Sequence, residues 1–340
     1  MDHSRRWKSF LYDGDHAISV HLDYEPTLAH KFPVLDILEF TNLIHTDDLD
    51  VFQKSSKIRA LTIYDPGLVS SQIPSWIQVT DLNLCASYEQ LEIILDKLPN
   101  LTFLRLVECS DSGHLMSSCL PPRTSNTIDT LHITVNDCDT PQGLLEAAFS
   151  SFSLPFLTEL RVLAGYRCKS YNRKWPQHLF AKFLSLSLCR ITTFVLERIG
   201  LSDTDLITAL QLLSSLVTLK ICDYKAFPKI SPITPDFISC LRSSGHTTHI
   251  RSNSHLVPKL RYLSLDFNGR NFDDMAFVSM VSSRWFPNLQ AAETAGVDCL
   301  RSVVLRFRKR EVDQTIYRPL QYLDKMGLMV VVRGTNDTGI

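Results

Sequence analysis

The sequence predicts an α/β protein in which short parallel strands stack into one curved solenoid, with helices on its convex side. Three observations lead to this prediction. An apolar triplet with the spacing L-x-x-L-x-L recurs along nearly the whole chain, segments with helix-start signals lie between the triplets, and a proline or a polar turn precedes many of them. One such strand cannot bury its apolar face alone, whereas many stacked strands share a continuous core.

The triplet has the same internal spacing in eleven segments, and it is clearest in LPNLTFLRLVECS, residues 98–110. Its members, in chain order, are Trp7/Phe10/Tyr12, Leu35/Leu38/Phe40, Ile58/Leu61/Ile63, Val79/Leu82/Leu84, Leu101/Leu104/Leu106, Ile128/Leu131/Ile133, Leu157/Leu160/Val162, Ile191/Phe194/Leu196, Leu216/Leu219/Ile221, Leu260/Leu263/Leu265 and Leu300/Val303/Leu305. The second and third members point to one side of a strand, so we expect them to be buried. The mean step is about 29 residues, at the upper edge of the leucine-rich-repeat period.

Helix signals occupy the connecting segments. Ser87 and Ser202 each begin a pattern that resembles a capping box, and Thr140 followed by Pro141 has the form of an N-cap and a first helical residue. The segment 273–286, DDMAFVSMVSSRWF, keeps its apolar residues near helical spacing. Each of these segments is expected to form a helix between two strands.

A chain of alternating helices and strands is also compatible with a doubly wound sheet. We prefer the solenoid because the triplet itself recurs, and a doubly wound sheet has no reason to repeat it. The segments FPVLDILEF, LPNLTFLRL, LPFLTELRV and VPKLRYLSL support this choice, since a proline before the strand ends the preceding helix and favours extended geometry.

We expect a single solenoid over residues 1–340 with about 11 repeats. Its regular spacing is interrupted at 225–258, where FPKISPITP contains three prolines and RSSGHTTHIRSNSH lacks apolar periodicity. The sequence therefore predicts a flexible insertion there, with one short helix around Phe237 and Leu241. A short disordered tail is expected over 333–340.

The composition is that of a soluble globular protein. The 340 residues include 44% hydrophobic residues and carry a formal net charge of -1, so the chain can bury a large core and has no overall bias toward nucleic acid or anionic membranes. No apolar stretch approaches the roughly 18 residues that a membrane span needs, and the N-terminus has no signal-peptide core. We expect a cytoplasmic or nuclear protein that binds neither nucleic acid nor membrane.

The nine cysteines are scattered, odd in number and never arranged as C-x-x-C. This pattern argues against a disulfide framework and against a zinc ribbon or finger. Reduced thiols are therefore expected.

The chain lacks the local signatures of the common enzyme classes: G-x-S-x-G, a Walker loop, G-x-G-x-x-G, H-E-x-x-H and the kinase set. We predict no catalytic residue, no metal-binding residue and no cofactor. His246, His249 and His255 lie together in the sequence, but no carboxylate or thiol lies nearby at ligand spacing, so we interpret the stretch as a solvated loop. The basic run Arg306–Glu311 is interpreted as a solvated rim.

The segments FPVLDILEF and VPKLRYLSLDFN, the opening HSRRWKSF and the closing CLRSVVLRFRKREVDQTIYRPLQYLDKMGLMVVV resemble the irregular leucine-rich-repeat region of fungal F-box proteins. The resemblance extends from Arg5 to Val332. It includes a closing unit in which a proline-containing helix ends at Gly327 and leads to a final strand, Leu328–Val332. It implies a protein-interaction solenoid like the substrate-recognition part of a cullin-type ubiquitin-ligase receptor.

The sequence departs from this family at two points. No F-box, whose apolar helices bind the Skp-type adaptor of the ligase, is found before Trp7, so we do not expect this chain to bind that adaptor. The family's ladder of asparagine or cysteine at the third position after the triplet is weak, with only Cys109, Asn136 and Asn268 in place. An irregular, loosely wound solenoid is expected, because no side-chain ladder satisfies the buried backbone throughout.

The residue between the second and third triplet members should point to the concave side. This row contains Glu39, Thr62, Asn83, Arg105, His132, Arg161, Val195, Lys220, Ser264 and Val304. Its basic members, the candidate partner-binding residues, are Arg105, His132, Arg161 and Lys220. They can steer an acidic segment of a protein partner, although polar residues occupy any solvated face. We predict a protein-interaction solenoid that is not an enzyme; the alternative is an enzyme whose loop-built site we do not recognise.

Overall fold

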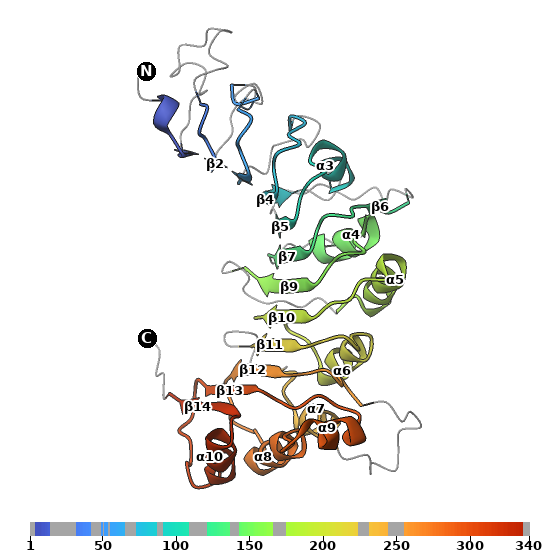
Figure 1. The fold of residues 1–340 in the computed structure, drawn as a ribbon, viewed down its shortest axis with the longest axis vertical. Coiled ribbons are helices and arrows are strands. Elements are labelled where there is room, and N and C mark those ends of the chain that lie inside the picture. The colour runs from blue at the N-terminus through green and yellow to red at the C-terminus, as the bar shows by residue number, and fades with distance from the viewer. Residues whose placement is uncertain are drawn as a thin grey trace. The chain divides into compact units, whose positions relative to one another are not determined.

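The structure is a computed structural model that describes residues 4–13, 32–41, 49, 51–53, 55–64, 73–86, 91–108, 121–136, 143–165, 175–223, 231–243 and 255–335. Its main sheet has twelve parallel strands, which follow one another in chain order. Helices lie in several of the connections between strands (Figure 1). These features confirm the predicted α/β class with the parallel sheet of a leucine-rich-repeat-like solenoid.

The strands of the main sheet are short, and each is centred on a predicted triplet or on the predicted final strand. They are β1 (Ser9–Tyr12), β2 (Ile37–Phe40), β3 (Ala60–Ile63), β4 (Asp81–Ala86), β5 (Phe103–Glu108), β7 (Thr130–Val135), β9 (Glu159–Ala164), β10 (Thr193–Glu197), β11 (Thr218–Cys222), β12 (Tyr262–Phe267), β13 (Ser302–Phe307) and β14 (Met329–Gly334). A separate two-stranded sheet pairs β6 (Arg123–Thr124) with β8 (Phe152–Ser153).

The chain divides into two compact units, which are described separately. Unit 1 comprises Met1–Leu157, Gly165–Cys168 and Lys182–Cys189 and contains β1 to β8; unit 2 comprises Thr158–Ala164, Lys169–Ala181 and Arg190–Ile340 and contains β9 to β14. The sequence predicts one solenoid and gives no sign of this division, because the triplet recurs through both units.

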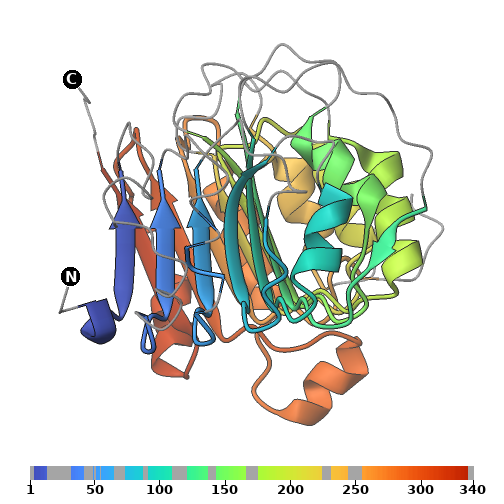
Figure 2. The same cartoon turned by 90° about the horizontal axis from the view of Figure 1, so that it is seen from above.

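Several helices of each unit lie beside its strands. The helices are η1 (Ser4–Arg6), α3 (Leu91–Lys97) and α4 (Leu144–Ser151) in unit 1, α6 (Asp203–Gln211), α7 (Pro235–Cys240), α8 (Asp274–Ser283), α9 (Leu289–Ala295) and α10 (Arg318–Lys325) in unit 2, and α5 (Gln177–Ser187), which has residues in both. Within unit 1, Figures 1 and 2 show α3 and α4 on one side of β4, β5 and β7; within unit 2, they show α6 on one side of its neighbouring strands. We call this side the helix face and the opposite side the open face.

The triplets form the core of each unit. All three members are buried in the ten triplets from Leu35/Leu38/Phe40 to Leu300/Val303/Leu305, which confirms the prediction for them. The prediction is wrong for the first triplet, since Phe10 and Tyr12 are only half-buried. Among the described strands β1 pairs with β2 alone, so it has packing partners on one side only.

The closing unit has the predicted form. α10 ends shortly before Gly327, whose φ of 101° is a left-handed conformation that favours glycine. β14 follows and pairs with β13 as far as Gly334, because β13 runs on to Phe307 and offers partners to the last residues of β14. The predicted tail over 333–340 therefore begins too early, since Arg333 is still in the strand; residues 336–340 lie outside the described part of the chain.

The predicted helix starts have different outcomes. Ser202 is the N-cap of α6, and its hydroxyl oxygen accepts a hydrogen bond from the Asp205 backbone N–H at 3.0 Å, as predicted. The predicted start at Thr140 is wrong, because α4 has Gly143 as its N-cap. The Glu146 side chain accepts from the Gly143 N–H at 3.0 Å and sets the start there. Ser87 lies outside the described residues.

A buried carboxylate also holds the start of α4. Glu108, at the end of β5, is 1% exposed. Its carboxylate accepts hydrogen bonds from the backbone N–H groups of Asn136 at 2.7 Å and Leu144 at 3.1 Å. The Asn136 amide donates in turn to the Glu108 backbone carbonyl, which is the task expected of a ladder asparagine.

The segment predicted as an insertion contains a packed helix. α7 is capped by Thr234, and its residues Phe237 and Ile238 are buried, which confirms the predicted short helix. Residues 224–230 and 244–254 lie outside the described part of the chain, so the flexibility of 225–258 stays a prediction.

A buried arginine joins the C-terminal end of α7 and the last residues of this segment to α8. Arg284, the C-cap of α8, is 0% exposed. Its guanidinium donates to the backbone carbonyls of Leu241, Leu256 and Val257, the last two at 2.6 and 3.0 Å. Burial lowers the pKa of Arg284 to about 10, so it remains protonated at neutral pH.

The cysteines differ in part from the expectation of reduced thiols. Cys189, Cys222, Cys240 and Cys299 are not disulfide-bonded. Cys85, in β4, is disulfide-bonded, which contradicts the expectation for this residue. Sequence spacing does not reveal which thiols a fold brings together, since a disulfide depends on the approach of two Cβ atoms.

Candidate functional site

The row between the second and third triplet members alternates with the buried triplet residues and therefore lies on the open face. In unit 1 the backbone register joins Glu39, Thr62, Asn83, Arg105 and His132 in that order across β2, β3, β4, β5 and β7. All five side chains are half-buried. Neighbouring strands are about 4.8 Å apart, so the two basic candidates of this unit are direct neighbours.

The surroundings of Arg105 restrict its movement without neutralising it. Phe103 lies two residues earlier in β5, and its ring meets the His132 ring edge-on with centroids 4.8 Å apart. The Asn83 side-chain amide donates to the Tyr64 hydroxyl at 2.6 Å. Within the described residues, the Arg105 Nε is buried without an acceptor and its guanidinium has no carboxylate partner. The charge of Arg105 is therefore not compensated by a carboxylate among the described residues.

A depression of about 270 Å³ lies beside this arginine. It is lined by Ala60, Leu61, Thr62, Asp81, Leu82, Asn83, Phe103 and Arg105. Pockets for drug-sized molecules usually measure roughly 300–1,000 Å³. The depression has the size to receive one or two side chains of a partner protein.

The candidate residues of unit 2 are in a different setting. Arg161 lies 3.2 Å from Glu159 of the same strand, so its charge is partly compensated. Val195 follows it in the register and is 1% exposed, which contradicts the expectation that the whole row is solvated. Lys220 is the next residue in the row and is exposed. The two cations of unit 2 are therefore separated by a buried valine, and only Lys220 is fully accessible.

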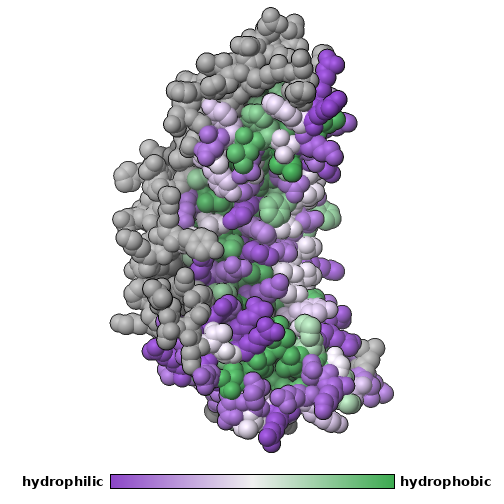
Figure 3. Space-filling model, turned by 90° about the vertical axis from the view of Figure 1, so that its left-hand side faces the viewer, coloured by the Kyte–Doolittle hydropathy of each residue, from purple (hydrophilic) through white to green (hydrophobic). Residues whose placement is uncertain are grey.

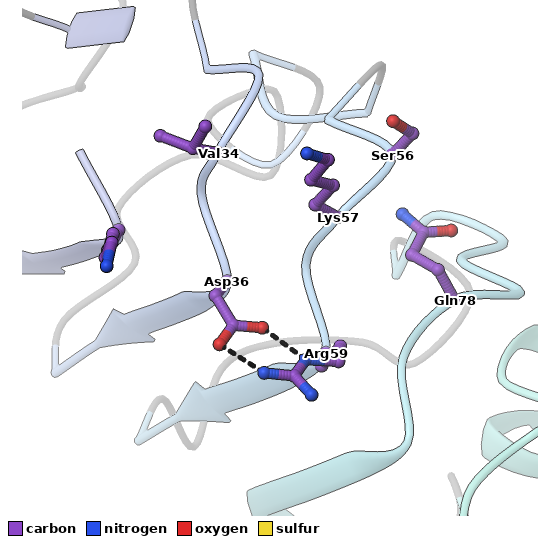
Figure 4. Close-up of a pocket in the computed structure, with 7 residues that line it drawn as sticks. Val34, Asp36, Ser56, Lys57, Arg59 and Gln78 are labelled. Carbon is purple, nitrogen blue, oxygen red and sulfur yellow. Dashed lines mark hydrogen bonds and ion pairs between the residues drawn. The ribbon is translucent and has the colours of Figure 1, made fainter. Parts of the chain in front are cut away.

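A second depression, of about 600 Å³, is formed by residues of the segments that lead into the first strands of unit 1 (Figure 4). It is lined by Lys8, Val34, Asp36, Ser56, Lys57, Arg59 and Gln78. Figure 4 shows the Arg59 guanidinium facing the Asp36 carboxylate, with N–O distances of 2.6 and 2.7 Å. The hydrogen bond from Arg59 lowers the pKa of Asp36. Because Arg59 is already paired with Asp36, the remaining positive charge of this depression comes from the exposed side chains of Lys8 and Lys57.

The basic run Arg306–Glu311 is divided between different environments. Arg306 is exposed on the open face of β13. Arg308 makes a two-fold ion pair with Asp266, and Arg310 pairs with Asp274. The interpretation as one solvated rim is therefore wrong for Arg308 and Arg310. Arg306 is in β13, whereas Arg308 and Arg310 follow the end of the strand at Phe307.

The histidine stretch is described only at His255, which is half-buried. His246 and His249 lie outside the described residues. Over the residues that are described, no group of three or more His, Cys, Asp or Glu side chains has the arrangement of a metal site. The prediction that the chain binds no metal and no cofactor stays a prediction.

None of the described helices is both long enough and apolar enough to cross a membrane. No protein-family model matches the chain, and no curated protein is similar enough in sequence to indicate a family.

Proposed function

We propose that this chain is a protein-interaction module that binds an acidic segment of a partner protein on the open face of its sheet. The observation that carries the proposal is the position of Arg105 beside His132 on the open face of unit 1. Charged groups usually find partners within a folded chain or remain fully hydrated. Arg105 is half-buried and has no carboxylate partner among the described residues.

The setting of Arg105 favours a peptide-like ligand. The arginine lies on a sheet, so its position is fixed by backbone register, and the depression beside it accepts side chains. A guanidinium binds a carboxylate with two parallel hydrogen bonds, which gives both attraction and geometry. Lys220 supplies a second accessible cation on the open face of unit 2.

The finer proposal follows the resemblance to fungal F-box proteins: the bound protein is a substrate to be recruited to a ubiquitin ligase, and the role is not catalytic. A pull-down with purified Skp-type adaptor tests the related prediction that this chain does not capture the adaptor. Stoichiometric recovery of adaptor, lost on removal of residues 1–30, would contradict that prediction.

The binding proposal is tested with a partner identified by proximity labelling in the native cell. We expect Arg105→Gln combined with Lys220→Gln to weaken the complex about tenfold and to flatten its salt dependence, because each exposed contact contributes at most about 1 kcal/mol and is screened by salt. The matched control is Arg190→Gln with Arg242→Gln, which removes two exposed charges outside the row. Equal binding by the double variant and the parent at low salt would refute the proposal.

A further inference from the structure

Two exposed arginines are adjacent on the open face of unit 2. Arg306 in β13 and Arg333 in β14 are register partners in a parallel pair of strands, so their side chains leave the same face about 4.8 Å apart. Both are exposed. Like charges in directly opposite positions of a sheet are unfavourable. An arginine pair of this kind is stabilised when an anion lies between the two guanidinium groups.

No described residue supplies that anion. Asp266 is the register partner of Arg306 on its other side, but its carboxylate is bound by Arg308 with both oxygens. Neither Arg306 nor Arg333 makes an ion pair or hydrogen bond with its side chain within the described residues. The Asp266 carboxylate is thus occupied by Arg308, and Arg306 and Arg333 remain available to a ligand.

An apolar patch adjoins the arginines. Two residues earlier in each strand the open face carries Val304 and Val331, which are register partners. Two further residues back, Met329 is 55% exposed, and Tyr262 is 45% exposed in β12. Figure 3 shows hydrophobic residues gathered in the lower part of the view, with hydrophilic residues beside them.

We infer that this surface binds an extended segment of a partner protein that carries an acidic residue followed at alternate positions by apolar residues. The inference goes beyond the proposed function, because it assigns a second surface on the open face and the ligand that fits it. The rows of arginines, valines and Met329 are two residues apart along the strands, and an extended peptide has the same rise of about 3.3 Å per residue. A carboxylate at position i then reaches Arg306 and Arg333, while side chains at i+2 and i+4 cover Val331 and Met329.

The apolar patch favours a protein segment over a phosphate-bearing ligand. A nucleic acid presents a phosphate to arginine but has no aliphatic side chain to bury beside it. Burying apolar surface contributes roughly 25 cal/mol per Å², and on this face the apolar residues lie on one side of the charged pair only. The ligand therefore needs an order, acidic then apolar, and the test uses that requirement.

The experiment measures binding of a defined peptide, acetyl-Gly-Glu-Thr-Leu-Thr-Leu-Gly-amide, to the full chain by calorimetry at low ionic strength. We expect Arg306→Ser with Arg333→Ser to weaken binding about tenfold or more. The same change at two exposed arginines outside the patch, Arg242→Ser with Arg270→Ser, should leave binding unchanged. Thermal unfolding of the Arg306/Arg333 variant should occur at the same or a higher temperature, because a repulsive pair is removed.

Three results would overturn the inference: equal weakening in the two double variants, equal binding of a peptide with glutamine in place of glutamate, or tighter binding of a single-stranded oligonucleotide than of the peptide. A peptide with the leucines moved to adjacent positions should bind more weakly, and equal binding would refute the proposed spacing. If the identified partner needs Arg105 but the peptide ignores Arg306 and Arg333, this inference fails while the proposed function stands. If the peptide binds the arginine pair but the loss of Arg105 and Lys220 does not weaken binding of the partner, the proposed function fails while this inference stands.

Discussion

Each unit buries one ion that satisfies backbone groups, and the two ions have opposite charge. In unit 1 the Glu108 carboxylate accepts hydrogen bonds from two backbone N–H groups, that of Asn136 after β7 and that of Leu144 at the start of α4. In unit 2 the Arg284 guanidinium donates to three backbone carbonyls, that of Leu241 at the C-terminal end of α7 and those of Leu256 and Val257. Burying a charge is costly unless it is fully hydrogen-bonded, and both residues meet that condition through the main chain.

This difference explains how the solenoid manages without a regular side-chain ladder. A repeat with asparagine or cysteine in every turn satisfies its connecting backbone in the same way each time. Here Asn136 does so once, through the Glu108 carbonyl, whereas the Asn268 Oδ1 is buried without a donor among the described residues. Irregular connections leave backbone N–H groups unpaired in one place and backbone C=O groups unpaired in another. A carboxylate accepts hydrogen bonds from the N–H groups, and a guanidinium donates hydrogen bonds to the C=O groups.

The largest expected effect is at Arg284. We predict that Arg284→Met destabilises the protein by about 4 kcal/mol, because three buried carbonyls lose their donors at about 1–3 kcal/mol each and the side chain that replaces arginine offers none. Urea unfolding measures the loss, and Arg301→Met, at an exposed position, is the control. A loss below about 1 kcal/mol would show that the three contacts do not hold the segment.

A somewhat smaller effect is expected at Glu108. Glu108→Gln keeps the shape but places an NH₂ group against one of two backbone N–H donors, so one hydrogen bond is lost and two donors face each other. We predict a loss of about 3 kcal/mol. Glu293→Gln, on the exposed side of α9, should change stability by less than about 0.5 kcal/mol. If the two variants unfold at the same urea concentration, the backbone role of Glu108 is wrong.

Unit 2 also contains a buried carboxylate that is only partly satisfied. Asp223 is 5% exposed; its Oδ2 accepts from the Ser231 hydroxyl, and its Oδ1 has no donor among the described residues. Burial, opposed by the hydrogen bond from Ser231 and reinforced by nearby Asp266, raises the pKa of Asp223 to about 6. In contrast, both oxygens of Glu108 are hydrogen-bonded.

This contrast predicts a pH effect of known sign. Because the pKa of Asp223 is higher in the folded than in the unfolded chain, the native state holds an extra proton between about pH 4 and about pH 6, and stability falls as pH rises through this range. Asp223→Asn removes the ionisation, so it should add on the order of 2 kcal/mol at about pH 7 relative to its effect at about pH 4. Unfolding of both proteins in urea at the two pH values checks this, and an equal difference at both would contradict it.

The smallest effect concerns Gly165. A methyl group at this position clashes with the Asn136 Oδ1, so the side-chain amide must move and its Nδ2 hydrogen bond to the Glu108 carbonyl is disturbed. We predict that Gly165→Ala costs about 1 kcal/mol in the parent. The cost should be much smaller in a background that already carries Asn136→Ala, since the two residues are in contact. Equal costs in the two backgrounds would mean that the clash is relieved in another way.

The strands could be predicted from the sequence because the triplet spacing is a local property of each strand. The capping of α6 by Ser202 was predictable for the same reason. Glu108 and Arg284 could not be found in this way, because their partners lie 27 to 43 residues away and only the fold brings them close. The local sequence around a charged residue at the end of a strand or helix does not indicate that its side chain will be buried.

The candidate binding residues show the same limit. The alternation of residues places the whole row on the open face, but it does not show that Glu159 compensates Arg161 or that Val195 is buried. Arg306 was visible as part of a basic run, whereas its proximity to Arg333 depends on the register of β13 and β14. The spacing of residues predicts which side chains share a face. Which of their charges remain without a counter-charge depends on tertiary contacts.

The central claim is that protein partners bind the open face of the sheet and do not bind the helix face. Site-specific photo-crosslinking in the native cell tests this most directly, with the crosslinker placed at Thr62 or Ser264 on the open face and at Ser150 in α4 or Gln211 in α6. We predict that the open-face positions give a discrete crosslinked protein, lost in the Arg105→Gln/Lys220→Gln variant, and that the helix positions do not. Crosslinks to the same protein from Ser150 or Gln211 alone would contradict the claim and place the binding surface on the helices.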